Sequence, residues 1–345
     1  MKLKKRQILL LLLLIAGTVY IAVDSRKTET RQEATVRKFS EPIFGTVMNV
    51  TYTSSEDLHD TIMTCLRTID SSLSMFNPTS TLAQINRGET DSLDHHLMQL
   101  LPMAHAVSDA TSGAFDVTVA PLVNAWGFGF KEGRMPTDAQ VDSLLQLVDY
   151  LSISVDNGRI SKSIAGSVID LSAIAKGYGV DQVASLLTER GVRDFLVEIG
   201  GEIVSRGSNP KGESWHIGIN KPTEDSTSTN NEVQEVLEVH DRAMATSGNY
   251  RNYYVTADGR KVAHTINPRT GRPVRHSLLS STVLAPSCAM ADAFATSFMV
   301  MGMDSAKTVL KRHPELRAYF IYADSTGTYR TWNNLNEEEH TDAKK

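Results

Sequence analysis

The 345-residue sequence predicts an α+β fold with largely antiparallel sheets and packed helices, behind a separate N-terminal segment. Several stretches carry apolar residues at helical spacing. Other stretches are β-rich and are joined by hairpin signals, among them the D-N-G run at 156–158 and the D-G pair at 258–259. Helices and strands alternate irregularly. The regular strand–helix–strand repeat of a parallel sheet is therefore not expected.

The first 23 residues combine a positive start with an apolar run. Lys2, Lys4, Lys5 and Arg6 precede residues 8–23, which carry no charge. Because a positive flank stays in the cytoplasm, we expect a signal anchor or signal peptide, with the uncleaved anchor favoured. The rest of the chain would then lie on the periplasmic side of a bacterial inner membrane.

A polar linker is expected at 24–38, because that stretch is charged and lacks aromatic residues. No basic patch follows the N-terminus, so nucleic acid is excluded as a partner. The two cysteines, Cys65 and Cys288, lack zinc-like spacing. We interpret them as small core residues in preference to a disulfide.

The first half of the folded part is expected to begin with a β-rich stretch at 43–53. Helices are expected at 56–76 and 94–112, and a third starts at a Thr137 or Asp138 cap. Residues 114–129 have no clear periodicity and are predicted to be irregular. A strand, the D-N-G turn and two more strands should follow.

The second half is expected to open with a helix over 175–190, stopped by Gly191. A strand pair broken at Gly200 and Gly201 and further strands follow. Next come an apolar helix beginning near Cys288, a second helix and a last strand at 316–324. Residues 334–345 are predicted to be a disordered tail.

The apolar helix contains one carboxylate, Asp292, in a setting where an unpaired charge is costly. Thr296 lies four residues later, so both oxygens share one helix face. Such a pair suits Mg²⁺, which prefers oxygen ligands. The alternative is that Asp292 caps the helix, although Ser287 is better placed to do so.

Two further stretches carry possible chemistry. Lys176 and two glycines stand at the start of a predicted helix, after Asp170, and such an arrangement can accept an anion. The alternative is a turn with a solvated lysine. His264 leaves a strand into an N-P turn, where a histidine can move protons. An isolated histidine is more often structural.

Together, these motifs resemble the ApbE family of FAD:protein FMN transferases. The matching runs occur in family order from about Phe44 to Gly302 and include "SMFNPTSTLAQIN", "TSGAFDVTVAPLVNAWGFG", "IDLSAIAKGYGVDQVASLL", "HTINPRTGRP" and "MADAFATSFMVMG". The resemblance implies that 39–333 form one flavin transferase domain. It further implies that FAD is split at its pyrophosphate and that FMN moves to a Thr or Ser hydroxyl of a membrane or exported redox protein, with release of AMP.

The resemblance also implies roles for particular residues. Mg²⁺ would be held by Asp292, Thr296 and the backbone carbonyl of Ala173. His264 would be the base that deprotonates the acceptor hydroxyl. The flavin pocket would contain Phe44, Phe76, Ala114, Phe115, Asp116, Asp170, Lys176 and Ile266.

Two of these positions depart from the family pattern, in which position 44 is usually Met and position 76 often Tyr. A phenylalanine still packs on a ring, but Phe76 lacks the hydroxyl. Two other functions remain open. A Mg²⁺-dependent FAD pyrophosphatase would use water in place of the protein hydroxyl. A non-enzymatic flavin-binding protein would be expected to have lost a metal ligand, yet Asp292 and Thr296 are both present.

Overall fold

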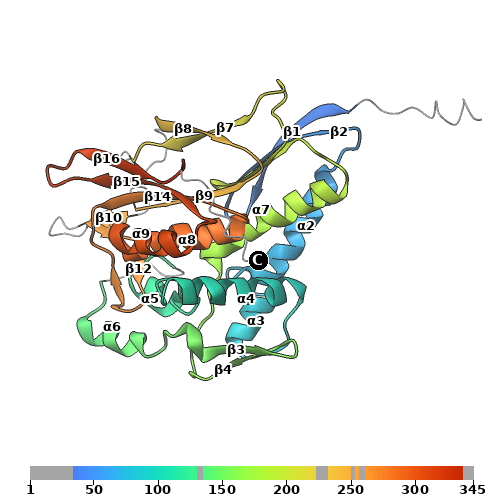
Figure 1. Ribbon diagram of the computed structural model, residues 1–345. Helices are drawn as coiled ribbons and strands as arrows, with labels where there is room; N and C mark the ends of the chain where they lie inside the picture. Colours follow the sequence, from blue (N-terminus) through green and yellow to red (C-terminus); the bar gives the residue numbers. More distant parts are fainter. Residues whose placement is uncertain (1–33, 130–134, 223–231, 250–252, 256–260, 337–345) are drawn as a thin grey trace, which may run out of the picture.

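An eight-stranded antiparallel sheet forms the upper layer of the molecule in Figure 1. The computed structural model describes residues 34–129, 135–222, 232–249, 253–255 and 261–336. In sheet order the strands are β1 (Thr35–Ile43), β2 (Thr46–Ser54), β5 (Phe195–Ile199), β6 (Glu202–Arg206), β9 (Ala243–Gly248), β14 (Leu278–Ala285), β15 (Arg317–Ala323) and β16 (Tyr329–Asn333). Every neighbouring pair is antiparallel, so the predicted fold class is confirmed.

Two central helices, α7 (Ser172–Glu189) and α8 (Cys288–Met301), cover one face of this sheet. Below α8 in both ribbon views lies α4 (His95–Ala110). Because α8 packs against β9 and β14 on one side and α4 on the other, 11 of its 14 residues are buried. This position explains why the sequence of α8 is apolar all round.

The remaining helices surround this core. They are α2 (His59–Leu73), α3 (Thr81–Arg87), α5 (Ala120–Ala125), α6 (Asp138–Leu145), the short 3₁₀ turn η1 (Tyr150–Ser152) and α9 (Met303–Arg312). As expected, Thr137 caps α6 in a capping box with Gln140. Residues 114–129 contain α5, so the prediction that this stretch is wholly irregular is wrong.

Smaller antiparallel pairs complete the fold. They are β3 (Ile153–Asp156) with β4 (Arg159–Lys162), β7 (Trp215–Asn220) with β8 (Val233–Val239), β10 (Tyr253–Val255) with β11 (Lys261–Ala263), and β12 (Ile266–Asn267) with β13 (Arg272–Pro273). The β7–β8 hairpin packs Ile217 and Val239 on the main sheet beside Ile203, Met244 and Leu284. The D-N-G turn joins β3 to β4 as predicted. The third strand expected after it is absent, since residues 163–170 pair with no neighbouring strand in the described structure.

The folded part extends beyond the predicted bounds of 39–333. Strand β1 begins at Thr35, inside the predicted linker 24–38, because its pairing with β2 continues to Ser54. Asn334 is buried, and its side chain accepts a hydrogen bond from Ala318 N at 2.7 Å. The predicted N-terminal segment 1–23 lies outside the described residues. Within the described ranges, no helix has the length and apolar character needed to cross a membrane.

Helices α7 and α8 approach each other unusually closely at Gly177. A Cβ atom at this position would lie 2.3 Å from the carbonyl oxygen of Cys288 and 2.6 Å from its carbon. Both atoms belong to the backbone of the facing helix. Only glycine fits here, which accounts for one of the two glycines after Lys176.

Gly177→Ala should therefore destabilise the fold by ~1–3 kcal/mol, because a helix backbone must shift to admit the methyl group. Gly179→Ala is the matched control, since its Cβ would meet the Phe44 ring at 2.7 Å and a side chain can rotate away. Urea unfolding of the two variants measures the difference. An equal or larger loss for Gly179→Ala would contradict this account of the helix contact.

Candidate active site

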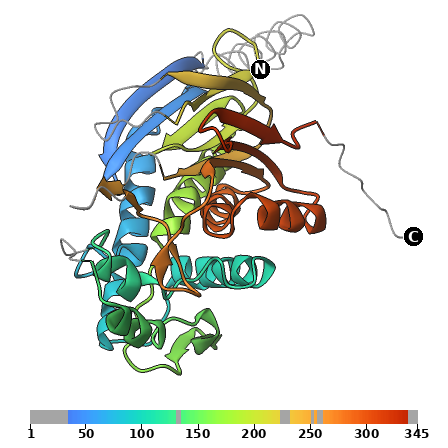
Figure 2. The ribbon, with the colours of Figure 1, turned by 90° about the vertical axis from the view of Figure 1, so that its left-hand side faces the viewer.

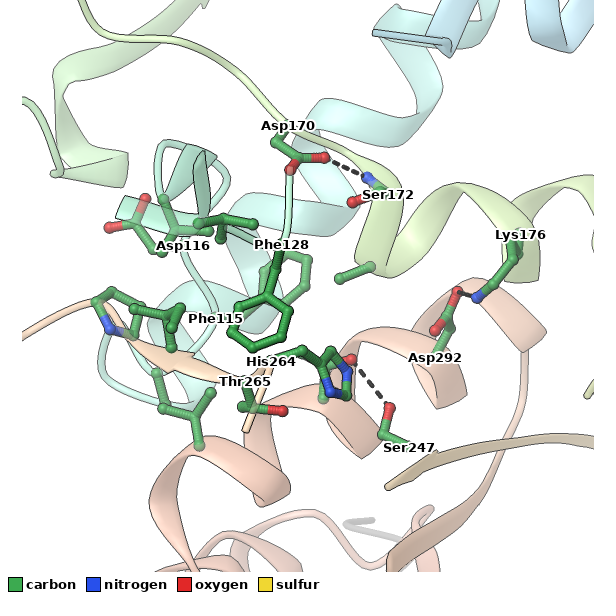
Figure 3. Close-up of a pocket in the computed structure, with 18 of the residues that line it drawn as sticks. Phe115, Asp116, Phe128, Asp170, Ser172, Lys176, Ser247, His264, Thr265 and Asp292 are labelled. Atoms are coloured by element: carbon green, nitrogen blue, oxygen red, sulfur yellow. Dashed lines mark hydrogen bonds and ion pairs between the residues drawn. The ribbon is translucent and has the colours of Figure 1, made fainter. Parts of the chain in front are cut away.

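A cavity of about 400 Å³ lies where the N-terminal turn of α7, helix α8, strand β9 and residues 264–268 converge (Figure 3). It contains ten of the twelve residues predicted to form the site. These are Ala114, Phe115, Asp116, Asp170, Ala173, Lys176, His264, Ile266, Asp292 and Thr296. Residues separated by up to 182 positions, from Ala114 to Thr296, are thus brought to one place.

The other two predicted residues, Phe44 and Phe76, line a neighbouring, more apolar cavity of about 650 Å³. The two cavities share Ser172 and Lys176, so they adjoin at the start of α7. Phe44 occupies the two-residue turn between β1 and β2 with φ +50°, in the left-handed region that a bulky residue rarely adopts. Phe76 is 64% exposed. A flat aromatic ligand would be able to lie against both rings.

Asp292 is 2% exposed and is compensated by two neighbouring groups on α7. The Lys176 ammonium lies 3.7 Å from its Oδ2 atom, and the Gly177 N–H donates to the same oxygen at 3.2 Å. Burial raises the pKa of Asp292, while Lys176 and the Gly177 hydrogen bond oppose that rise. The carboxylate does not cap its own helix, because the Ser287 hydroxyl accepts from Met290 N in that role.

Glu202, the first residue of β6, joins this cluster and was not predicted from the sequence. Its Oε1 atom lies 3.1 Å from Lys176 Nζ, and its Oε2 atom is buried without a hydrogen-bond partner in the described structure. Burial, reinforced by the charge of Asp292, raises the pKa of Glu202 to about 8. Burial alone would lower the pKa of Lys176, but the two carboxylates raise it above its ordinary range.

The available sequence signal for Glu202 was a carboxylate directly after Gly200 and Gly201, followed by the apolar pair Ile203 and Val204. From the sequence, this stretch was interpreted only as a strand pair broken at Gly200 and Gly201. Pairing of Glu202 with a lysine from a different element cannot be derived from its neighbours in the chain.

Asp181 fixes the position of α8 relative to α7. Its two carboxylate oxygens accept the backbone N–H groups of Cys288 at 2.7 Å and Ala289 at 2.9 Å. These donors belong to the first turn of α8, where N–H groups lack partners within the helix. Burial raises the pKa of Asp181 to about 6, although both backbone hydrogen bonds act against this rise.

Thr296 and Ala173 supply further oxygens beside Asp292. The Thr296 hydroxyl lies 3.0 Å from that of Ser247 on β9, and Ala173 belongs to the first turn of α7. The donor set of carboxylate, hydroxyl and carbonyl fits a hard cation such as Mg²⁺, as does the buried, unpartnered oxygen of Glu202. Among the described residues, no group of three or more His, Cys, Asp or Glu residues could hold a metal ion.

Asp116 and Asp170 line the cavity but also maintain its walls. Asp116 Oδ1 accepts from the backbone and hydroxyl of Thr118, and Oδ2 accepts from Tyr150 N at 3.1 Å. Asp170 Oδ1 accepts from Ser172 N at 2.8 Å, at the entrance to α7. Burial raises the pKa of both carboxyls. In Figure 3 Asp116 points away from Lys176 and Asp292.

His264 lies on the side of the cavity opposite α7, near Ser247 in Figure 3. Its ring makes an edge contact with Phe128, with centroids 6.3 Å apart. The turn that follows is anchored by Trp126, whose indole N–H donates to the Gly271 carbonyl at 2.7 Å. The imidazole is thus half-buried at the cavity wall, where a proton acceptor could reach a bound ligand.

The fold and the site define a class of protein: an α+β ligand-binding protein whose oxygen-lined pocket suits a cation and a phosphate-bearing ligand. The sequence profile of the ApbE family matches residues 44–320. The chain therefore belongs to the ApbE family.

Relatives and solved structures agree with that assignment. A Vibrio cholerae protein named FAD:protein FMN transferase is 38% identical over 282 residues, covering 78% of this chain and 83% of the relative. An Escherichia coli K12 protein of the same name is 32% identical over 335 residues, covering 93% of each. The flavin transferase ApbE structure from Vibrio cholerae superposes with a TM-score of 0.79 at 33% identity, covering 88% of this chain and 98% of that one. The apo flavinyl transferase ApbE from Pseudomonas stutzeri has a TM-score of 0.78 at 31% identity, covering 87% and 95%.

Asp181→Asn tests the account of the α8 contact through its pH dependence. The pKa of Asp181 is higher in the folded protein, about 6, than in the unfolded chain, roughly 3.9. The folded state therefore binds the proton more tightly, and the wild type loses stability as pH rises from about 4 to about 6.

The variant carries no such proton, so its stability relative to the wild type should improve by up to ~2–3 kcal/mol between pH 4 and pH 7. Urea unfolding of both proteins across this range gives the difference. A difference that is independent of pH would show that the Asp181 carboxyl does not titrate in this way.

Proposed function

We propose that this chain transfers the FMN part of FAD to a Ser or Thr hydroxyl of an acceptor protein and releases AMP. The observation that carries the proposal is the grouping of Asp292, Thr296 and Lys176 in a cavity that also contains His264. Membership in the ApbE family and relatives named FAD:protein FMN transferase support the same reaction.

The pyrophosphate of FAD is proposed to lie beside Asp292 and Lys176. Asp292, Thr296 and the Ala173 carbonyl would hold Mg²⁺, which supplies positive charge at the phosphate oxygens. Lys176 adds a fixed ammonium on the same side, one turn into α7, whose N-terminal N–H groups favour an anion. Phosphoryl transfer depends mainly on positioning and on neutralising this charge.

The flavin ring is proposed to occupy the apolar cavity between Phe44 and Phe76. The two cavities adjoin at Ser172 and Lys176. A ligand could therefore place its aromatic ring in the apolar cavity and its phosphates in the cavity that contains Asp292. The strained backbone at Phe44 supports this placement, because strained residues gather at ligand sites.

His264 is proposed to be the general base. It takes the proton of the acceptor hydroxyl as the hydroxyl oxygen attacks the phosphorus of the FMN half. The bond from that phosphorus to the bridging oxygen breaks, and AMP leaves with the bonding electron pair. A phosphoester remains on the acceptor, and water in place of the hydroxyl would give FMN and AMP instead.

We also propose that the acceptor is an exported or membrane-bound redox protein. The support is the sequence alone, namely the positive and then apolar residues 1–23. On this proposal the domain works at the periplasmic face of a bacterial inner membrane, held there by its N-terminal segment.

One assay tests the reaction. Purified protein is mixed with FAD, Mg²⁺ and candidate acceptor proteins, and a fluorescent acceptor band with the mass increase of FMN is expected. Chelation of the metal, or Asp292→Ala, should lower the rate at least ~100-fold, while thermal unfolding shows the variant folded. FMN and AMP without a labelled band would favour the pyrophosphatase, and full activity of Asp292→Ala would refute the metal assignment.

His264→Ala should abolish transfer while FAD still binds, because the imidazole acts on the acceptor and not on the flavin. Transfer is expected to fall by ~10²–10⁴-fold, the usual contribution of a general base. The FAD dissociation constant, followed by flavin fluorescence, should change little. Unchanged transfer by this variant would eliminate His264 as the base.

A further inference from the structure

Glu202 is a buried carboxylate to which the proposed reaction assigns no role. It is 3% exposed, and one of its oxygens, Oε2, has no hydrogen-bond partner among the described residues. It lines the same cavity as Asp292. Burying a carboxylate in this way is unfavourable, so a compensating function is expected.

Lys176 stands between Glu202 and Asp292 but is not shared equally. Its ammonium lies 3.1 Å from Glu202 Oε1, a hydrogen-bond distance, and 3.7 Å from Asp292 Oδ2, which is too long for one. The same Asp292 oxygen already accepts the Gly177 N–H. The shorter contact of the ammonium is therefore with Glu202.

The role of Glu202 rests on the cation site proposed above. We infer that Glu202 is a positioning residue that holds the Lys176 ammonium away from Asp292 and so keeps that carboxylate open to a divalent cation. Without the charge of Glu202, Asp292 would be the one carboxylate among the described residues left to pair with Lys176. A lysine ammonium paired fully with Asp292 would neutralise it and would repel the incoming cation.

Two roles for Glu202 make opposite predictions. If Glu202 controls cation binding through Lys176, removal of Lys176 should abolish the effect of losing Glu202. If Oε2 of Glu202 binds the cation directly, removal of Lys176 cannot restore the lost ligand. The distance of 3.1 Å between Glu202 Oε1 and the Lys176 ammonium supports the first role, whereas the second role would use the unpartnered Oε2 atom.

The test measures cation binding by the full chain without FAD, so it does not depend on turnover. Mg²⁺ is titrated by calorimetry and Mn²⁺ by electron paramagnetic resonance, at pH 8.5 so that Glu202 is ionised. Glu202→Gln should weaken binding ~10-fold or more, the usual effect of a residue that orients a metal ligand. Glu202→Gln combined with Lys176→Met should bind at least as tightly as the wild type.

Glu198→Gln is the matched control. Glu198 lies on the same β5–β6 hairpin, where it accepts hydrogen bonds from Gly201 N and from the Asn49 amide, and it does not contact Lys176. Its substitution removes the same charge and should leave cation affinity within about twofold. Thermal unfolding of each variant confirms that the fold is intact.

The outcomes separate this inference from the proposed function. If the wild type binds the cation and Glu202→Gln binds it equally well, the role of Glu202 is refuted and the metal site stands. If adding Lys176→Met to Glu202→Gln fails to restore binding, Glu202 is a ligand itself and the inference is wrong. If the wild type binds neither cation, the metal assignment of the proposed function fails and the inference fails with it.

Discussion

The close contact between α7 and α8 is the constraint on which the site depends. At Gly177 the backbone of one helix meets the Cys288 carbonyl of the other, and a single methyl group would prevent it. Asp181 reinforces the contact by accepting two N–H groups from the first turn of α8. Because these contacts hold the two helices together, Lys176 on α7 lies beside Asp292 on α8.

The charged cluster at this contact is more costly than an apolar core would be. Two buried carboxyl groups share one ammonium, burial raises the pKa of both, and one of their oxygens has no donor in the described structure. Buried ion pairs seldom repay their desolvation. Buried polar groups that are incompletely paired in this way are expected where a protein binds a ligand. A cation on one side and phosphates on the other would balance these charges.

Part of the site was predictable from short motifs with chemical meaning, and the rest followed from the resemblance to the ApbE family. The spacing of Asp292 and Thr296 on one helix face required only the helical repeat, and ten of the twelve predicted residues line one cavity. Glu202 was missed because its partner belongs to a different element. Helix α5 and strand β16 were not predicted, and the predicted domain bounds of 39–333 did not reach Thr35 or Asn334. Cross-strand partners, rather than local composition, decide where a strand ends.

The sequence by itself determined the α+β class, the polarity of each helix, the chemical groups available and the family. Hydrophobic periodicity, turn residues and sequence motifs are local properties, so they can be identified from the sequence alone. Only the tertiary structure decided which charges neutralise one another. The separation of Lys176 Nζ from Glu202 and from Asp292, 3.1 Å against 3.7 Å, arises from how β6, α7 and α8 pack. Ion pairing depends on such distances in space, and spacing along the chain does not encode them.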